Sequence, residues 1–446
     1  MDPQPLDLLI RNAGHVVTMI GPDVPGGWVG CRAGVVQAVG PAGSEPAATE
    51  VVDARGAIVT PGLVNAHHHL FQNLTRAHAD SSACTLGPWL EMLRPVWALL
   101  DRETAYLSAW IGLADLALAG CTTTGDNLYL HPAPGLVEET LRAAAEVGLR
   151  LDPTRGYIDR QRLDVRGAED ADAVLEASRT LLEEWHDPAP GSRCRVSLGP
   201  TALPATRTEL LPELAALAAE HDARLSLHLF EEAGENDRAR EVHGRGAVEL
   251  LVDSGWADRA WIAHGNHVDA ADAAALAAAG IGLAHCPSSN LLLGGPAARL
   301  DLLDDAGVAV GLGTDGAASA GTSQLWLEAR TALLLQRQHR GADAFGARRA
   351  LELATTGAAA CLGRAGEVGG LAPGMQADLV VWETSGPAYA GAVTDPVETW
   401  LRCGPPRARH TIVGGRAVVR DGALVADGLD EHLDLHRKHA VAWQSR

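Results

Sequence analysis

Lysine is almost absent from the sequence: Lys438, near the C-terminus, is the only one, and all other basic residues apart from histidine are arginine. This scarcity excludes every mechanism that depends on a central lysine. The chain can form no Schiff base and can place no lysine on a bound phosphate. It also cannot bridge two metal ions through a carbamylated lysine.

Paired cysteines, a basic surplus and long apolar runs are lacking as well. The seven cysteines are dispersed without a C-x-x-C pair, which is typical of reduced thiols in the cytoplasm. The net charge of −20 argues against nucleic acid or an anionic membrane as partner. The most apolar helical stretch, residues 107–120, contains Asp115 and is too short to span a bilayer. Because the start of the chain shows no signal-peptide pattern, we expect a soluble cytoplasmic protein.

Small and aliphatic residues are abundant, and they follow a repeating order. Between residues 61 and 367, apolar strand-like runs alternate with helical stretches such as 209–220, 246–252 and 270–279. This order predicts an α/β protein with a (β/α)₈ TIM-type barrel, whose active site lies at the carboxyl ends of the strands. Eight candidate strands end near His67, Asp126, Arg155, Leu198, His228, His264, His285 and Asp315.

Short β-like runs occupy both ends of the chain. They cover residues 8–11, 16–19, 34–39 and 51–53 at one end, and 377–382 and 410–419 at the other. Neither group has enough strands to form a stable domain alone, so we expect both to pair in one small β-sandwich. The predicted limits are residues 1–60 and 368–446 for the two parts of the sandwich, the second with a terminal helix, and 61–367 for the barrel.

Metal-capable side chains stand where the predicted strands stop. Side chains alternate along an extended segment, so His67 and His69 project to one side of it and His68 to the other. Any one histidine taken alone is explained equally well as a satisfied buried residue. The whole set at successive strand ends favours a metal site, because neutral imidazoles and a carboxylate are zinc ligands. The set comprises His67, His69, His228, His264, His285 and Asp315.

Three of the strand-end residues suit proton transfer. Glu231 follows His228 by three residues and can reach a metal-bound water, whose proton it would carry to a leaving group. Asp315 can both ligate the metal and accept the proton of the attacking water. His264 could ligate the metal or hydrogen-bond that water, and the sequence leaves both roles open. Glu232 is interpreted as a solvated loop charge.

Several side chains are candidates for the wall of a substrate pocket. Gln72 offers a donor and an acceptor to the amide edge of a ring. Arg155 carries fixed donors that could face a ring carbonyl or enolate oxygen. Phe71, Trp89 and Trp97 either stack on a flat heterocycle or pack within the loop after the first strand.

The order of these motifs resembles the amidohydrolase superfamily along nearly the full length of the chain. The resemblance implies one metal ion per chain, Zn²⁺ or alternatively Fe²⁺, held by His67, His69, His228 and Asp315. The missing lysine fits, because two-metal members usually bridge their ions with a carbamylated lysine. The matching segments are P-G-L-V-N-A-H-H-H at 61–69, A-H-G at 263–265, H-C-P-S-S-N at 285–290, G-T-D-G at 313–316 and the tail at 369–382.

Within the superfamily, residues 67–77 and 88–97 resemble the 8-oxoguanine deaminases and the related triazine and aminoheterocycle hydrolases. The resemblance implies hydrolytic deamination of an oxidised purine or a similar small heterocycle. A pterin deaminase, or a triazine hydrolase that removes chloride or an alkylamine, is the alternative. Phe230 and the pair Ser319-Ala320 depart from the usual pattern and bear on the substrate. A metal-free scaffold would have lost ligand positions, and none is lost. Superfamily members are often dimers or larger, so a homo-oligomer is compatible with the resemblance.

Overall fold

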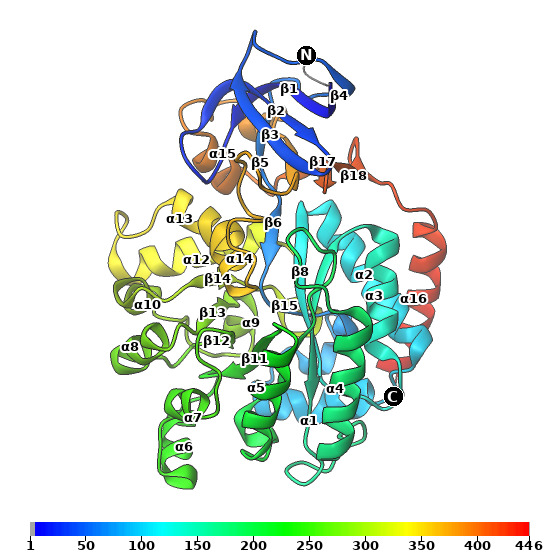
Figure 1. Cartoon of the computed structure of the whole chain (residues 1–446), viewed down its shortest axis with the longest axis vertical. Coiled ribbons are helices and arrows are strands. Elements are labelled where there is room, and N and C mark those ends of the chain that lie inside the picture. Colours follow the sequence, from blue (N-terminus) through cyan, green and yellow to red (C-terminus); the bar gives the residue numbers. More distant parts are fainter. Residues whose placement is uncertain (1–4, 446) are drawn as a thin grey trace.

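Eight parallel strands form the centre of the larger part of the molecule (Figure 1). The computed structural model describes residues 5–445. The strands are ordered as in the sequence, and Ala66 N donates to Leu312 O at 2.8 Å, which joins the first strand to the last. The predicted α/β barrel is therefore confirmed. Its strands are β6 (Leu63–Asn65), β8 (Cys121–Leu128), β9 (Arg150–Tyr157), β10 (Ser197–Pro200), β11 (Arg224–Leu229), β12 (Ala260–His264), β13 (Gly282–His285) and β14 (Val310–Leu312).

Helices cover the outside of the barrel, and local sequence signals fix their ends. For example, the Asp101 side chain accepts from Thr104 N at 2.9 Å, which caps the helix that follows it. Gly148 ends another helix in the left-handed conformation that glycine adopts without steric cost. The main helices are α1 (Leu86–Trp97), α2 (Arg102–Leu118), α3 (Leu136–Val147), α4 (Ala171–Trp185), α5 (Leu210–Glu220), α6 (Glu235–His243), α7 (Ala247–Asp253), α8 (Ala270–Ala278), α10 (Leu300–Ala306), α12 (Leu325–Arg340) and the terminal α16 (Leu429–Gln444).

Strands from both chain ends pair in one nine-stranded sheet above the barrel (Figure 1). The two ends meet where Val59 lies opposite Val381 in an antiparallel pair. The predicted association of the chain ends is therefore confirmed, whereas the domain limits at residues 60 and 367 stay a prediction. The strands are β1 (Leu6–Val16), β2 (Val24–Arg32), β3 (Val35–Pro41), β4 (Ala48–Asp53), β5 (Ile58–Pro61), β16 (Leu379–Glu383), β17 (Arg407–Val413), β18 (Arg416–Arg420) and β19 (Ala423–Leu424).

Two details of this sheet differ from the sequence prediction. The segment β2 was not predicted, because Pro25, Gly26 and Gly27 interrupt its apolar pattern. The run at 16–19 is no separate strand: β1 continues to Val16, and the chain then turns away with Met19 in a left-handed conformation. Both errors lie far from the strand ends that carry the site.

A buried carboxylate connects the sheet to the barrel. Asp378 pairs with Arg150 at the start of β9, with 2.7 Å between Asp378 Oδ2 and Arg150 Nε, and both side chains are almost fully buried. The backbone carbonyl of Asp378 accepts from Gly62 N at 2.9 Å, and Gly414 N donates to its side chain. Gly62 is the single residue between β5 of the sheet and β6 of the barrel. The hydrogen bonds of Asp378 therefore hold the chain where it passes from one unit to the other.

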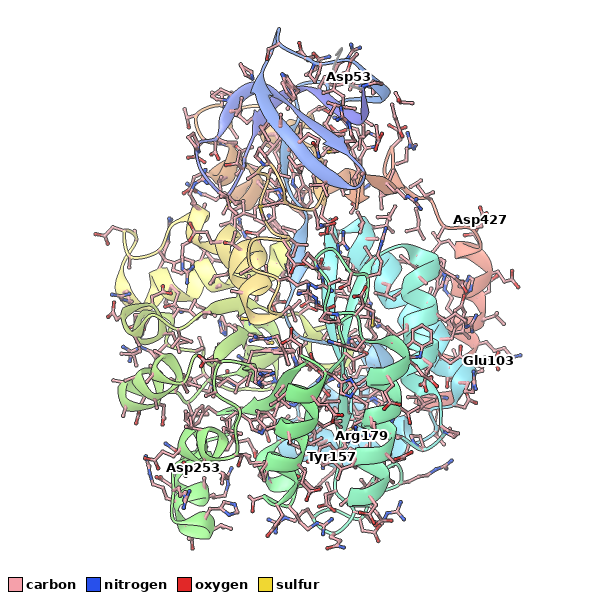
Figure 2. All side chains as sticks on the ribbon, viewed as in Figure 1. Asp53, Glu103, Tyr157, Arg179, Asp253 and Asp427 are labelled. Carbon is pink, nitrogen blue, oxygen red and sulfur yellow. The ribbon has the colours of Figure 1, made fainter. Side chains whose placement is uncertain are left out.

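Charged side chains are spread over the outside of the molecule (Figure 2). Asp53, Glu103, Asp253 and Asp427 lie at its margins in this view, in keeping with the net charge of −20. Within residues 5–445, no helix combines the length and the apolar character needed to cross a membrane.

Candidate active site

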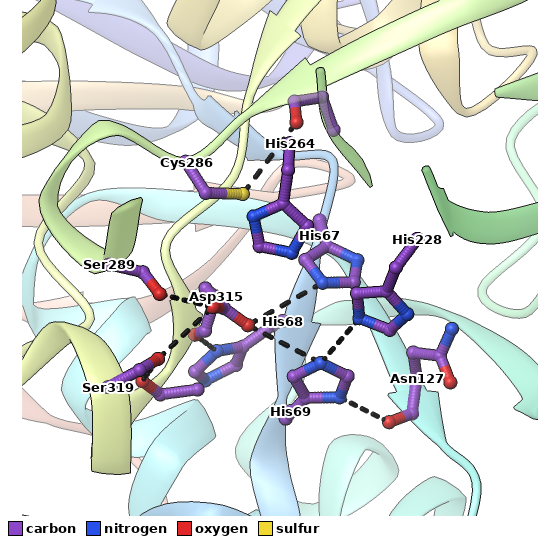
Figure 3. Close-up of polar contacts among 12 residues, drawn as sticks. His67, His68, His69, Asn127, His228, His264, Cys286, Ser289, Asp315 and Ser319 are labelled. Carbon is purple, nitrogen blue, oxygen red and sulfur yellow. Dashed lines mark hydrogen bonds and ion pairs between the residues drawn. The ribbon is translucent and has the colours of Figure 1, made fainter. Parts of the chain in front are cut away.

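Two short parallel strands bring the histidine cluster against Asp315. The chain leaves β6 and forms β7 (His68–His69), which pairs with β15 (Asp315–Gly316), and Asp315 N donates to His67 O at 3.0 Å. Because side chains alternate, His67 and His69 face the barrel axis together. His68 points the other way, and its Nδ1 hydrogen-bonds the backbone carbonyl of Asp315 (Figure 3). The alternation predicted for this segment is confirmed.

His69 and His228 point their Nε2 atoms at each other, 3.0 Å apart. The Nδ1 of His69 lies 2.6 Å from the carbonyl of Asn127, and the Nδ1 of His228 lies 2.5 Å from that of Thr201. A carbonyl can only accept, so each Nδ1 carries the proton and each Nε2 presents a lone pair. Burial lowers the pKa of both imidazoles, so both are neutral at physiological pH. Two facing lone pairs require a cation between them.

His67 and Asp315 complete this group of donors. Burial lowers the pKa of His67 to about 3, and its Nε2 is buried without a hydrogen-bond partner. The Oδ1 atom of Asp315 lies 3.6 Å from His67 Nε2 and 3.3 Å from His69 Nε2. Three neutral imidazoles and one carboxylate are the ligand types that zinc and related divalent cations take. The donor set thus fits a divalent metal ion, which would also satisfy the unpartnered nitrogen of His67.

Helix α9 (Pro287–Leu292) and a serine after β15 orient the acid and the fourth histidine. Ser289 Oγ donates to Asp315 Oδ2 at 2.5 Å, and Ser319 Oγ donates to the same oxygen at 3.1 Å (Figure 3). The Nδ1 of His264 lies 2.9 Å from Asn290 Oδ1, which leaves its Nε2 facing the cavity. From the sequence, the S-S-N segment was noted only as a match to the superfamily pattern, and Ser319 only as a departure from it. Their contacts now assign them a positioning role.

Glu231 follows β11 and lies beside His264, with 3.5 Å between Glu231 Oε1 and His264 Nε2. Burial raises the pKa of Glu231 to about 8, although the charge of the nearby His228 lowers it in part. The carboxylate of Glu235 accepts from the backbone N–H groups of Phe230 at 2.8 Å and Glu232 at 2.7 Å, on either side of Glu231. These bonds hold Phe230 in a left-handed conformation (φ 57°), so the turn presents Glu231 to the cavity.

A cavity of about 300 Å³ opens over the metal-capable group. Its wall includes Tyr129, whose ring lies 5.4 Å from that of His69. Of the aromatic candidates from the sequence, Trp89 lines the cavity, whereas Phe71 and Trp97 pack behind it against one another. Other lining residues are Gln72, Leu86, Leu90, Arg94, Arg162, Glu231, Glu232, Glu235 and Arg238.

Arg155 does not line this cavity, in contrast to its predicted substrate contact. Its guanidinium forms two hydrogen bonds of 2.7 Å with the carboxylate of Glu169 and lines a neighbouring cavity with His131. Its donors are directed to Glu169, and its substrate contact stays a prediction. His285 also stands apart, and its two ring nitrogens are buried without partners. It belongs to neither set of donor atoms close enough to share an ion, which are His67, His69 and His228, and His67, His264 and Asp315.

Gln72 lines the cavity as predicted, and Gly316 makes room for it. The Gln72 side chain is buried, and its Oε1 has no hydrogen-bond partner, so this acceptor is free for a ligand. A Cβ atom on Gly316 would lie 1.8 Å from Gln72 Oε1. The immediate neighbour of this glycine is therefore the Gln72 amide.

Gly316→Ala is therefore expected to displace the Gln72 amide and to lower kcat/KM by roughly 10- to 100-fold, since small misplacements of a positioning group are costly. Metal content, measured by elemental analysis, should stay at the parent level because no donor atom moves. Gly346→Ala is the matched control, because its Cβ would meet nothing within 4 Å and its φ of −101° suits any residue. Equal losses of kcat/KM in both variants would contradict the inference that Gly316 makes room for the Gln72 side chain.

A second buried acid, Glu328, lies beneath the site. Its Oε2 accepts from Ser288 N at 2.9 Å, at the start of the helix that carries Ser289 and Asn290. Burial raises the pKa of this carboxyl from 4.5 to about 8, although the bond from Ser288 lowers it. Between these two values the folded chain keeps a proton that the unfolded chain has released, so stability falls as the pH rises.

We therefore expect Glu328→Gln, which cannot ionise, to gain stability relative to the parent as the pH rises from 5 to 8.5. The melting temperatures of the two proteins should be similar at pH 5 and differ by at least about 3 °C at pH 8.5. Thermal melts across this range measure the difference. A gap that is constant with pH would show that Glu328 does not change its protonation on unfolding.

Comparison with known proteins identifies the class. The model of the amidohydrolase family matches residues 58–418, and the chain belongs to this family. It is a metal-dependent hydrolase of the deaminase and aminohydrolase type. The 8-oxoguanine deaminase of Pseudomonas aeruginosa is 38% identical over 97% of this chain and 98% of its own. The hydroxydechloroatrazine ethylaminohydrolase of Pseudomonas sp. (strain ADP) is 34% identical over 96% and 88%.

Solved structures agree with this assignment. The crystal structure of the atrazine chlorohydrolase of Arthrobacter aurescens TC1, complexed with zinc, aligns with a TM-score of 0.91 and 28% identity, covering 97% of this chain and 100% of that chain. A zinc-containing relative with the same fold agrees with the donor set at the barrel mouth. The fit to a divalent metal therefore rests on both the side chains and the fold.

Proposed function

We propose that this protein is a zinc-dependent deaminase that hydrolyses the C–N bond of an amino-substituted N-heterocycle, with 8-oxoguanine as the substrate we favour. The observation that carries the proposal is the facing pair of neutral imidazoles, His69 and His228, next to Glu231 in one cavity. The likeness to an 8-oxoguanine deaminase over 97% of the chain supports the choice of substrate.

The ion would be held by His67, His69, His228 and Asp315. When bound, zinc polarises a water molecule and brings its pKa to about 7. One ion per chain suffices, since no lysine near the site could bridge a second one. All seven cysteines are free thiols, which supports a reducing, cytoplasmic location for the enzyme.

The proton transfers are assigned to three side chains. Asp315 and His264 orient the attacking water and take its proton, because the Nε2 of His264 and the carboxylate of Asp315 both face the cavity. Glu231, whose pKa is raised to about 8, starts as the neutral acid and protonates the ring nitrogen. The water oxygen bonds to the amino-bearing carbon, and its remaining proton passes through Glu231 to the amine as the C–N bond breaks. The first water proton, taken by Asp315 and His264, then restores the neutral Glu231. Ammonia leaves and the ring keeps an oxo group.

Gln72 is assigned to the substrate, with its free Oε1 accepting from a ring N–H. Trp89 provides an aromatic wall to the same cavity, and a cavity of about 300 Å³ suits one mono- or bicyclic ring. A second candidate is removal of an alkylamine or chloride from a triazine, which the ethylaminohydrolase and the chlorohydrolase among the relatives support. A third is deamination of isoxanthopterin.

The test is a release assay with the zinc-loaded protein. Ammonia is measured from 8-oxoguanine, isoxanthopterin and amino-hydroxytriazines, and ethylamine and chloride from the corresponding triazines. We expect ammonia from 8-oxoguanine with the highest kcat/KM. Faster release of ethylamine or chloride would replace the substrate assignment, and no release from any ring would overturn the proposal of a heterocycle deaminase.

A further inference from the structure

One row of side chains on α1 faces the cavity and ends in a cation. Leu86, Leu90 and Arg94 are spaced by four residues, so they lie on one face of the helix, and all three line the cavity. Trp89 lies beside this row and is buried. The helix thus presents a flat apolar wall to a ring and places a guanidinium at the end of that wall.

Among residues 5–445, the guanidinium of Arg94 has no hydrogen-bond or ion-pair partner. Its Nε is buried without a hydrogen-bond acceptor, and no carboxylate among residues 5–445 forms an ion pair with it. Arg155, by contrast, directs two hydrogen bonds to Glu169. A partly buried guanidinium keeps its charge and five donors at any physiological pH, so leaving it unpaired costs free energy. A ligand that pairs with it would recover this free energy.

The charges around the cavity fix the kind of ligand group. Oε1 of Gln72 is a buried acceptor without a partner, and the reacting carboxylates Glu231 and Asp315 stand with the histidines. The other charged lining residues are Glu232, Glu235, Arg162 and Arg238. A cation beside the apolar wall therefore complements an oxygen with negative character. An oxo group next to a ring N–H is such an oxygen, because the lactam can release its proton and place the charge on oxygen. Two N–H groups of a guanidinium can also converge on this one oxygen.

We propose that Arg94 binds the oxo group on the part of the ring that does not bear the scissile amine, and so selects oxo-substituted bicyclic aminoheterocycles. This inference rests on the proposed deaminase function and deepens it by naming the substrate class. Neutral, alkylated chlorotriazines offer no oxygen to Arg94 and would leave it unpaired in the complex, which disfavours them.

The experiment compares two substrate pairs, each differing by one oxo group: 8-oxoguanine with guanine, and isoxanthopterin with pterin. For Arg94→Met we expect kcat/KM to fall roughly 10- to 100-fold on the oxo member of each pair, as for a lost hydrogen bond to a charged group. On the member without that group, the change should stay below about threefold by the same reasoning. Added guanidinium ion should partly rescue Arg94→Ala on the oxo substrates alone.

Arg162→Met is the matched control, because it removes the same charge from an exposed side chain of the cavity wall. It should leave the ratio of the two kcat/KM values within about twofold of the parent, as expected for exposed charges. Equal losses on both members of a pair in Arg94→Met would overturn the inference while the deaminase proposal stood. If the parent released no ammonia from any ring, the deaminase proposal would fail by itself.

Binding of the oxo product, urate from 8-oxoguanine or the trioxo-pteridine from isoxanthopterin, keeps the inference testable in that case. It is followed by quenching of tryptophan fluorescence, to which Trp89 in the cavity wall contributes. Tighter binding to the parent than to Arg94→Met, by the same 10- to 100-fold, supports the oxygen contact independently of turnover. Equal affinities of the two proteins would contradict it.

Discussion

Glu231→Gln is expected to retain its metal ion and to lose about 10³-fold in kcat, the range that general acid–base catalysis contributes. The amide fills the same space beside His264 but cannot deliver a proton to the ring nitrogen or to the departing amine. Glu231 is no part of the donor set, so elemental analysis should give the parent metal content. Steady-state kinetics with the best substrate of the release assay measure the loss.

Glu232→Gln is the matched control, since it removes the same charge one residue further along, from an exposed side chain. Its kcat should stay within about threefold of the parent, as is usual for an exposed charge. If Glu231→Gln kept a comparable rate, or if both variants lost activity equally, the proton shuttle would have to be assigned to another group.

His228→Gln is expected to bind little metal and to lose at least about 10⁴-fold in kcat/KM, because the rate then depends on water that no ion activates. The Nδ1 of His228 is held by the Thr201 carbonyl, so its Nε2 has one fixed direction, toward His69. Glutamine cannot reproduce both contacts. Metal content and activity measured on the same preparation should fall together.

His131→Gln is the matched control for this loss. His131 also bonds a backbone carbonyl, that of Gly156 at 2.9 Å, but it lines the neighbouring cavity, away from the other histidines. This variant should keep its metal and most of its activity. A His228→Gln protein with full metal content would remove His228 from the proposed ligand set.

The barrel and the placing of metal-capable residues at its strand ends could be predicted because both follow from periodicity, whereas the choice of four ligands among them came from the resemblance to the amidohydrolase superfamily. Apolar runs separated by helical stretches specify parallel strands, and parallel strands bring their carboxyl ends to one rim. Each predicted strand end lies within a few residues of the observed one, from β6 to β14. His67 and His69 share a side because strand side chains alternate, which needs no knowledge of the tertiary structure.

The remainder depends on neighbours that are distant in the sequence. The prediction for Arg155 could not include Glu169, which lies on a separate segment and takes up its donors. In the same way, Ser289 and Asn290 are ordinary polar residues until the fold places them against Asp315 and His264. Arg94 was missed because a helical arginine is usually solvated, and only the fold shows that its Nε is buried without an acceptor.

The single glycine between β5 and β6 makes the position of the active-site histidines depend on the sheet formed by the two chain ends. The histidine pair begins five residues after Gly62, which hydrogen-bonds to the backbone of Asp378 from the C-terminal part of the sheet. Loss of that part would therefore loosen the segment that aims His67 and His69, although none of its residues lines the cavity. The terminal sheet holds the segment that carries the first two proposed ligands. We therefore expect binding of the ion and pairing of the strands from the two chain ends to occur as one cooperative event.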